Sequence, residues 1–144
     1  MATTAPCESC VAMSDLIDPV PAGEPAIRVT TMPADANPYG DIFGGWLMSQ
    51  MDMAAGLVAS RHARGRAVTI AVEGMKFHAP VAVGDEVSVY ADLVATGRTS
   101  MTIDVQAWRR GRHVEERCRV TQARFVFVAI DEARRPRAID ASAI

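Results

Sequence analysis

A single aspartate interrupts an otherwise uncharged stretch of nineteen residues. Asp52 is the one charged side chain between residues 42 and 60, and its neighbours are methionine, alanine and glycine. Apolar side chains recur around it at helical spacing, at Leu47, Met51, Ala54 and Val58. This spacing predicts a largely buried helix over about residues 45–59. Because burying an unpartnered carboxylate is costly, Asp52 is either paired with a group from another element or is a working acid in a cleft.

Two glycines, Gly44 and Gly45, stand at the start of the predicted helix. The first amides of a helix have no partner within it and carry the positive end of its dipole. Glycines let a ligand approach that backbone closely, so these amides could receive a carbonyl oxygen as an oxyanion hole does. The glycines could equally serve the turn, or close packing of the helix on a sheet.

Two turns also carry groups able to bind a ligand. Asn37 begins the sequence Asn-Pro-Tyr-Gly, the preferred residue order of a type I turn, and its amide could polarise a carbonyl group or orient water. Gly97-Arg98-Thr99-Ser100 places one cation, two hydroxyls and loop amides together. That combination suits a phosphate, although a plain hairpin turn explains it nearly as well.

Metal and nucleophile motifs are weak in this sequence. His62, His78 and His113 show no metal-ligand spacing, and no GxSxG motif is present. Three cysteines are too few for a disulfide framework. Cys7-x-x-Cys10 could be a redox pair or half of a zinc site, but no second ligand pair follows it. We therefore expect no metal and no cofactor.

Length and charge exclude several classes of protein. The 144 residues, of 15.5 kDa, suffice for one domain, and 15 basic against 17 acidic residues give a net charge of -2. No basic footprint indicates a nucleic-acid partner. No apolar run approaches the roughly 18 residues of a membrane span, and the first ten residues lack the pattern of a secretion signal. The expectation is a cytoplasmic protein without a membrane span.

The elements that position these residues follow from the remaining pattern. Residues 1–24 read as a poorly ordered tail, residues 25–133 as the domain and residues 134–144 as a C-terminal tail. Period-two alternation predicts five strands, over about residues 26–31, 68–77, 87–93, 101–107 and 114–130. In the second of these, Val68, Ile70 and Val72 are expected to share one face, with a bulge at Gly74. One long helix wrapped by a five-stranded antiparallel sheet is an α+β fold.

Several blocks of the sequence carry a family resemblance. NPYGDIFGGWLMSQMDMA (37–54), VTIAVEGMKF (68–77), PVAVGDEV (80–87), TGRTSM (96–101) and TQARFVFVAID (121–131) are the matching segments. Together they resemble the YciA-type acyl-CoA thioesterases, which are related to the brain acyl-CoA hydrolase group of the hotdog superfamily. The resemblance covers about residues 29–136, and the hotdog fold that it implies is the α+β layout given above.

The resemblance implies hydrolysis of acyl-CoA thioesters to a carboxylic acid and CoA, in fatty acid metabolism. By matching positions, Asp52 is the general base or the nucleophile, and the residues leave that choice open. Asn37 orients the water or the thioester, the amides of Gly44 and Gly45 receive the thioester oxygen, and the 97–100 turn contacts CoA.

The resemblance also implies a homo-oligomer built from dimers. The active site then lies at the dimer interface, so that Asn37 and Asp52 of one site come from different chains. A dimer, a tetramer and a hexamer all remain open. The partners expected are therefore the acyl-CoA substrate, the CoA product and other copies of the chain.

Two departures and two alternatives accompany this interpretation. Ala79, preceded by His78, replaces a lysine common in the family, and Pro38-Tyr39 replaces smaller or more polar residues. A hotdog hydratase or dehydratase would pair the helix acid with an earlier histidine, but none lies between residues 1 and 61. A non-catalytic acyl-CoA binding or sensing module is the other alternative.

Overall fold

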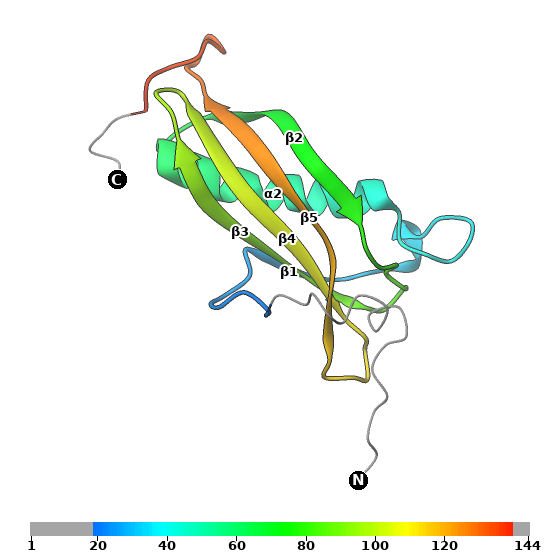
Figure 1. Ribbon diagram of the computed structural model, residues 1–144. Coiled ribbons are helices and arrows are strands. Elements are labelled where there is room, and N and C mark those ends of the chain that lie inside the picture. The colour runs from blue at the N-terminus through cyan, green and yellow to red at the C-terminus, as the bar shows by residue number, and fades with distance from the viewer. Residues whose placement is uncertain (1–18, 140–144) are drawn as a thin grey trace.

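The computed structural model describes residues 19–139 as one helix packed on a five-stranded sheet (Figure 1). Its elements are β1 (Ile27–Thr30), the 3-10 helix η2 (Pro33–Asp35), α2 (Gly44–Ala63), β2 (Ala67–Phe77), β3 (Glu86–Thr96), β4 (Ser100–Arg110) and β5 (Arg117–Ala129). The strands lie in the order β1-β3-β4-β5-β2, and every neighbouring pair is antiparallel. The predicted α+β architecture is confirmed.

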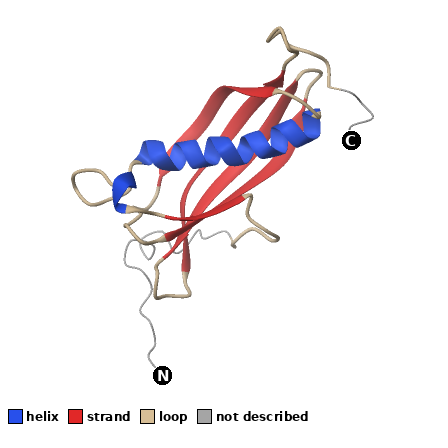
Figure 2. Ribbon diagram, turned by 180° about the vertical axis from the view of Figure 1, so that it is seen from behind, coloured by secondary structure: helices blue, strands red, loops and turns tan. Residues whose placement is uncertain are grey.

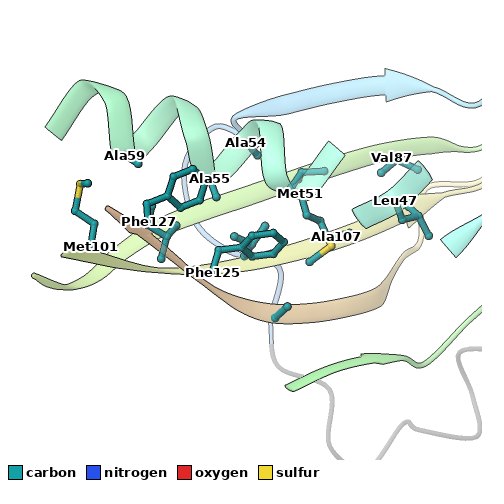
Figure 3. Close-up of a cluster of buried hydrophobic side chains, with 14 of the residues drawn as sticks. Leu47, Met51, Ala54, Ala55, Ala59, Val87, Met101, Ala107, Phe125 and Phe127 are labelled. Atoms are coloured by element: carbon teal, nitrogen blue, oxygen red, sulfur yellow. The ribbon is translucent and has the colours of Figure 1, made fainter. Parts of the chain in front are cut away.

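The core lies between α2 and one face of the sheet, which the helix crosses (Figure 2). The helix buries Leu47, Met51 and three alanines on this side, at positions 54, 55 and 59. Phe125 and Phe127 of β5 fill the space opposite (Figure 3). Small alanine side chains bring the helix backbone close to the sheet, where the aromatic rings restore the packing density of a protein interior.

The helix extends four residues beyond its predicted end, to Ala63. It stops at Arg64, which adopts the left-handed conformation (φ 52°), and the amide of Gly65 donates to the carbonyl oxygen of Ser60 at 3.2 Å. The prediction was short because the basic run that begins at Arg61 interrupts the apolar helical spacing. Basic side chains at a helix C-terminus instead favour the negative end of the dipole.

Strand β2 differs from its predicted pattern because its pairing with β5 shifts twice. Val68 lies opposite Val128, whereas Val72 lies opposite the buried Phe125, with a shift between them at Ile70. The expectation that Val68, Ile70 and Val72 share one face is therefore wrong, since one extra residue reverses the alternation. The second shift contains Gly74 (φ 66°), so the bulge predicted there is confirmed.

Some predictions fall outside the described residues. Cys7 and Cys10 are among them, so the redox-pair or zinc interpretation of their spacing stays untested. Cys118, on β5, is half-buried and takes part in a disulfide. Within residues 19–139, no helix is both long and apolar enough to cross a membrane.

Candidate active site

Asp52 lies near the middle of α2, at the border between its buried and exposed sides. The hydroxyl of Thr69, on β2, donates a hydrogen bond to the Asp52 carboxylate, with Oγ1 and Oδ1 2.5 Å apart. The first of the two alternatives for Asp52, a partner from another element, is therefore present in the neighbouring strand. Asp52 is half-buried and Thr69 is exposed, so water can reach this pair in the single chain.

The Asp52 carboxylate is held but not neutralised. Within residues 19–139, the Thr69 hydroxyl is its one polar partner, and no cation pairs with it. A carboxylate oriented by one hydroxyl keeps its second oxygen available. That oxygen can accept a proton from water or attack an electrophilic carbonyl carbon.

The first turn of α2 exposes two amides that have no hydrogen-bond acceptor in the described part of the chain. No side chain caps the helix, and its first hydrogen bonds run from the amides of Trp46 and Leu47 to the carbonyl oxygen of Phe43, at 3.1 and 3.3 Å. The amides of Gly44 and Gly45 are therefore left for another acceptor.

The two glycines differ in their surroundings. A Cβ at Gly44 would lie 3.1 Å from the ring of the half-exposed Phe77, so a larger residue there would make the ring shift by a few tenths of an ångström. A Cβ at Gly45 would meet nothing within 4 Å. Gly44 therefore packs closely on Phe77, and an open approach to the backbone exists at Gly45. Beside them, a pocket of about 410 Å³ is lined by nine residues that include Gly44, Phe77 and His78.

Asn37 forms the predicted turn and leaves a donor free. Its backbone carbonyl accepts from the amide of Gly40 at 3.1 Å. Its side-chain oxygen Oδ1 accepts from the amides of Tyr39 and Asp41, at 2.8 and 3.1 Å. The side-chain nitrogen Nδ2 has no acceptor within residues 19–139. The turn thus fixes the amide so that its nitrogen can donate to a ligand.

The 97–100 turn lies at the other end of the sheet, where α2 ends (Figure 1). The amide of Gly97 donates to the carbonyl oxygen of Ser100 at 2.8 Å, which closes the turn between β3 and β4. Arg98 is exposed. This geometry is that of a plain hairpin turn, and the Arg98 guanidinium takes no part in closing it.

One chain does not bring the predicted site residues together. At 1.5 Å per residue, α2 separates Gly44 from Asp52 by about 12 Å. Asn37 lies beyond the start of the helix, and the 97–100 turn lies at its end. Thr69 was missed by the sequence analysis, because a threonine in an alternating strand carries no signal of its own and its pairing depends on how α2 crosses β2.

Exposed apolar side chains lie on α2 and β2, the two elements that carry Asp52 and Thr69. We call these residues the β2-edge surface: Met48, Met53 and Leu57 on α2, and Val68, Ile70 and Val72 on β2. Leu57 is 51% and Ile70 59% exposed. Strand β2 is one of the two edge strands of the sheet and pairs with β5 alone. An apolar patch beside an unpaired strand edge is typical of a surface that another chain covers.

A metal-based site has no support in the described part of the chain. Within residues 19–139, no three side chains of the ligand types His, Cys, Asp or Glu lie together as a metal site would require.

Comparisons with known proteins identify the family of this chain. The thioesterase superfamily profile matches residues 39–116. An uncharacterized acyl-CoA thioester hydrolase of Zymomonas mobilis is 59% identical over 127 residues, covering 88% of this chain and 85% of the relative. The acyl-CoA thioester hydrolase YciA of Escherichia coli K12 is 47% identical over 123 residues, covering 83% and 93%.

Solved structures agree with the sequence relatives. A hexameric thioesterase from Yersinia pestis superposes with a TM-score of 0.80 at 48% identity, covering 85% of this chain and 99% of that one. The helix and the five-stranded antiparallel sheet are thus the hotdog fold of that superfamily. The chain belongs to the thioesterase superfamily, among the YciA-type acyl-CoA thioester hydrolases.

Proposed function

We propose that two copies of this chain form the catalytic unit that hydrolyses acyl-CoA thioesters, with Asp52 as its catalytic carboxylate. The observation that carries the proposal is the position of Asp52. It is held by one hydroxyl, pairs with no cation among the described residues, and lies on a helix that carries apolar side chains which its own chain leaves exposed.

A single chain lacks the geometry for the reaction. A thioester carbonyl group must lie about 3 Å both from the attacking group and from the amides that receive its oxygen. The Gly44 amide and Asp52 are separated by about 12 Å along α2. A second chain is therefore needed to supply one of the two groups.

The topology of the β2 edge suggests how the second chain supplies it. Asp52 is bonded to Thr69 near the beginning of β2, whereas Gly44 packs on Phe77 at its end. If two β2 strands pair antiparallel about a two-fold axis, the beginning of one lies opposite the end of the other. The helix start of one chain then faces Asp52 of its partner, and the β2-edge surface of both chains becomes buried.

The proposed chemistry follows from these groups. The amides of Gly44 and Gly45 hold the thioester oxygen as it gains negative charge, and Nδ2 of Asn37 donates to the thioester or to the attacking water. Asp52 removes a proton from that water, which attacks the carbonyl carbon. Collapse of the tetrahedral intermediate breaks the C–S bond, and the CoA thiolate takes up a proton. Attack by the carboxylate itself, followed by hydrolysis of the anhydride, uses the same groups.

Assembly and location extend the proposal. The relative from Yersinia pestis is described as hexameric, and three such dimers would make a hexamer. We place the 97–100 turn against the CoA part of the substrate. A cytoplasmic location and a role in fatty acid metabolism complete the proposal.

Release of free CoA thiol from acyl-CoAs of two to sixteen carbons tests it, with the wild type and Asp52→Ala compared directly. We expect turnover by the wild type and loss of it in the variant, with the oligomer intact. A folded wild-type oligomer that binds acyl-CoA without turnover would instead identify a non-catalytic acyl-CoA binding module.

A further inference from the structure

The disulfide of Cys118 has a partner that the cysteine count restricts to two residues. The sequence contains three cysteines, Cys7, Cys10 and Cys118. Cys118, on β5, takes part in a disulfide. Within one chain its partner is therefore Cys7 or Cys10, both of which precede the described residues. Neither the hotdog fold nor the proposed thioesterase site makes use of such a cross-link.

Two aromatic residues are buried on the face of the sheet that α2 does not cover. Val89 of β3 and Ala107 of β4 lie opposite each other and belong to the core beneath the helix. Because side chains alternate along a strand, the adjacent Tyr90 and Trp108 point to the other face. They are only 5% and 2% exposed, and neither belongs to that core. Since the helix lies on the opposite face (Figure 2), another part of the chain covers them.

The bonded cysteine adjoins these two rings, which we call the outer patch. Cys118 lies opposite Arg109, the residue that follows Trp108. Arg117, the residue before Cys118, donates from Nη1 to the hydroxyl of Tyr90 at 3.4 Å. A segment bonded to Cys118 is therefore held beside both aromatic side chains.

The outer patch needs an apolar cover. The indole Nε1 of Trp108 donates to Oε1 of Gln106 at 2.9 Å, and the Tyr90 hydroxyl accepts from Arg117. The polar atoms of both rings thus have partners within the described chain, and what remains is ring surface. Apolar side chains are what such a surface packs against.

The residues before position 19 have the composition and the length for this role. Residues 11–17 read Val-Ala-Met-Ser-Asp-Leu-Ile, with apolar side chains at five of seven positions. From Cys10 to Ile27, the first residue of β1, an extended chain reaches about 56 Å. In the order β1-β3-β4-β5, three strand spacings, about 14 Å, separate β1 from β5. Either cysteine can therefore reach Cys118.

We infer that residues 1–18 are a strap, bonded through Cys7 or Cys10 to Cys118, whose apolar side chains cover the outer patch. The third cysteine stays a thiol. Cys118 is thus a cross-linking site, and the bond closes a loop that contains most of the chain. The inference goes beyond the proposed function and does not depend on it, because none of the three cysteines belongs to the thioesterase site.

The Cys7-x-x-Cys10 spacing makes the cross-link reversible. The thiolate of the third cysteine attacks the sulfur of its neighbour, which forms a Cys7–Cys10 disulfide and breaks the bond to Cys118. The Cys118 thiolate takes up the proton that the attacking thiol lost, and no electrons enter or leave. Complete reduction consumes two molecules of a thiol such as glutathione, which leave as glutathione disulfide. An excess of thiol therefore releases the strap, and an excess of glutathione disulfide binds it.

Peptide mapping locates the bond in the full-length protein. The protein is equilibrated with glutathione disulfide, its free thiols are alkylated, and it is cleaved after glutamate without reductant. Glu8 lies between Cys7 and Cys10, and Glu116 precedes Cys118, so the three cysteines fall in different peptides. We expect the Cys118 peptide to be joined to one of the other two, with one alkylated cysteine per chain. An alkylated Cys118, or two Cys118 peptides joined to each other, would overturn the inference.

Thermal unfolding measures the contribution of the cross-link. A bond that closes a loop of about 100 residues constrains the unfolded chain, so the oxidised wild type should melt about 10 °C above Cys118→Ser. The double variant Cys7→Ser/Cys10→Ser should match Cys118→Ser, and it serves in its place if Cys118→Ser does not fold. Reductant should lower the midpoint of the wild type and leave both variants unchanged. Equal midpoints in oxidised and reduced wild type would contradict the cross-link.

Trp108 reports whether the strap covers the outer patch. The chain has two tryptophans, so Trp46→Phe leaves Trp108 as the single indole fluorophore. On reduction, its emission should shift to longer wavelength, and iodide should quench it more strongly. The matched control, Trp46→Phe/Cys118→Ser, should show the exposed spectrum with and without reductant. If emission and quenching are the same in the oxidised and reduced protein, the strap does not cover Trp108 and the inference fails.

Discussion

The two sides of α2 differ in what covers them. Met51, on one side, has no exposed surface and packs on the sheet of its own chain. Leu57, on the other side, is 51% exposed although it is equally apolar. Asp52 lies at the border between them. The first side is explained by the folding of one chain, and the second requires a partner.

The sheet repeats this contrast in its strands. β5 pairs on both of its edges and buries Phe125 and Phe127. β2 pairs on one edge, carries two register shifts and exposes Ile70. Within a single chain both edges of β5 are paired, whereas one edge of β2, beside the carboxylate that we assign to catalysis, is unpaired. We call the side of Leu57 and β2 the open side, and the side of Met51 and β5 the closed side. Substitutions on the open side should affect activity or assembly, and substitutions on the closed side should affect stability.

The largest effect is expected at Asp52. Asp52→Asn keeps an oxygen that can accept from Thr69 but removes the basic carboxylate, so kcat should fall about 10³-fold. Steady-state release of CoA thiol measures this, and the thermal midpoint should stay close to that of the wild type. Asp92→Asn, at an exposed position of β3, is the control. Activity within a few-fold of wild type in Asp52→Asn would remove Asp52 from the mechanism.

The next largest effect is expected on the closed side. Met51→Ala removes a fully buried side chain and should lower the free energy of unfolding by about 3 kcal/mol, since the site cannot collapse completely. Urea denaturation at a fixed protein concentration measures it. Met32→Ala, at an exposed methionine, should stay within about 0.5 kcal/mol. Equal effects at the two methionines would mean that the helix is not packed as described.

A charge on the open side should act on assembly. Ile70→Lys places two like charges near the two-fold axis proposed for paired β2 strands, which should weaken the dimer by about 2 kcal/mol and reduce activity with it. Light scattering over a dilution series gives the oligomeric state. Val94→Lys, at a comparably exposed site on β3, should leave it unchanged. If Ile70→Lys assembles as the wild type does, the chains do not join through β2.

The smallest effect is expected at Thr69. Thr69→Val keeps the shape of the side chain and removes its donor, so the carboxylate loses its one polar partner among the described residues. We expect kcat to fall about tenfold. Thr69→Ser keeps the hydroxyl and should retain most of the activity. If kcat of Thr69→Val is not lower than kcat of Thr69→Ser, the hydroxyl does not orient Asp52.

The contrast between the two sides also marks how far the sequence could predict the structure. The side of α2 that packs on its own sheet could be predicted from the helical spacing of Leu47 and Met51 and from the alternation of β3 and β4. These patterns reflect burial within one chain, so a single sequence contains them. Asp52 was found for the same reason, as a charge where burial was expected.

The open side was predicted less well. A one-residue shift at Ile70 reverses which side chains of β2 face the helix, and nothing in a single strand's alternation reveals it. The Thr69 bond depends on that shift. Asn37 and the two glycines were identified by the family resemblance and by turn chemistry, but their distance from Asp52 within one chain could be known only from the fold.

The central claim is that each active site is shared between two chains, and complementation tests it most directly. Asn37→Asp keeps the oxygen that closes the turn and removes the Nδ2 donor, whereas Asp52→Asn removes the carboxylate, so each variant alone should be nearly inactive. When the two are unfolded, mixed in equal amounts and refolded together, half of the dimers contain one chain of each kind, and one of their two sites is intact. We predict recovery of about one quarter of the wild-type activity. No recovery in a mixture shown to contain mixed dimers would contradict the account, because both groups would then belong to the same chain.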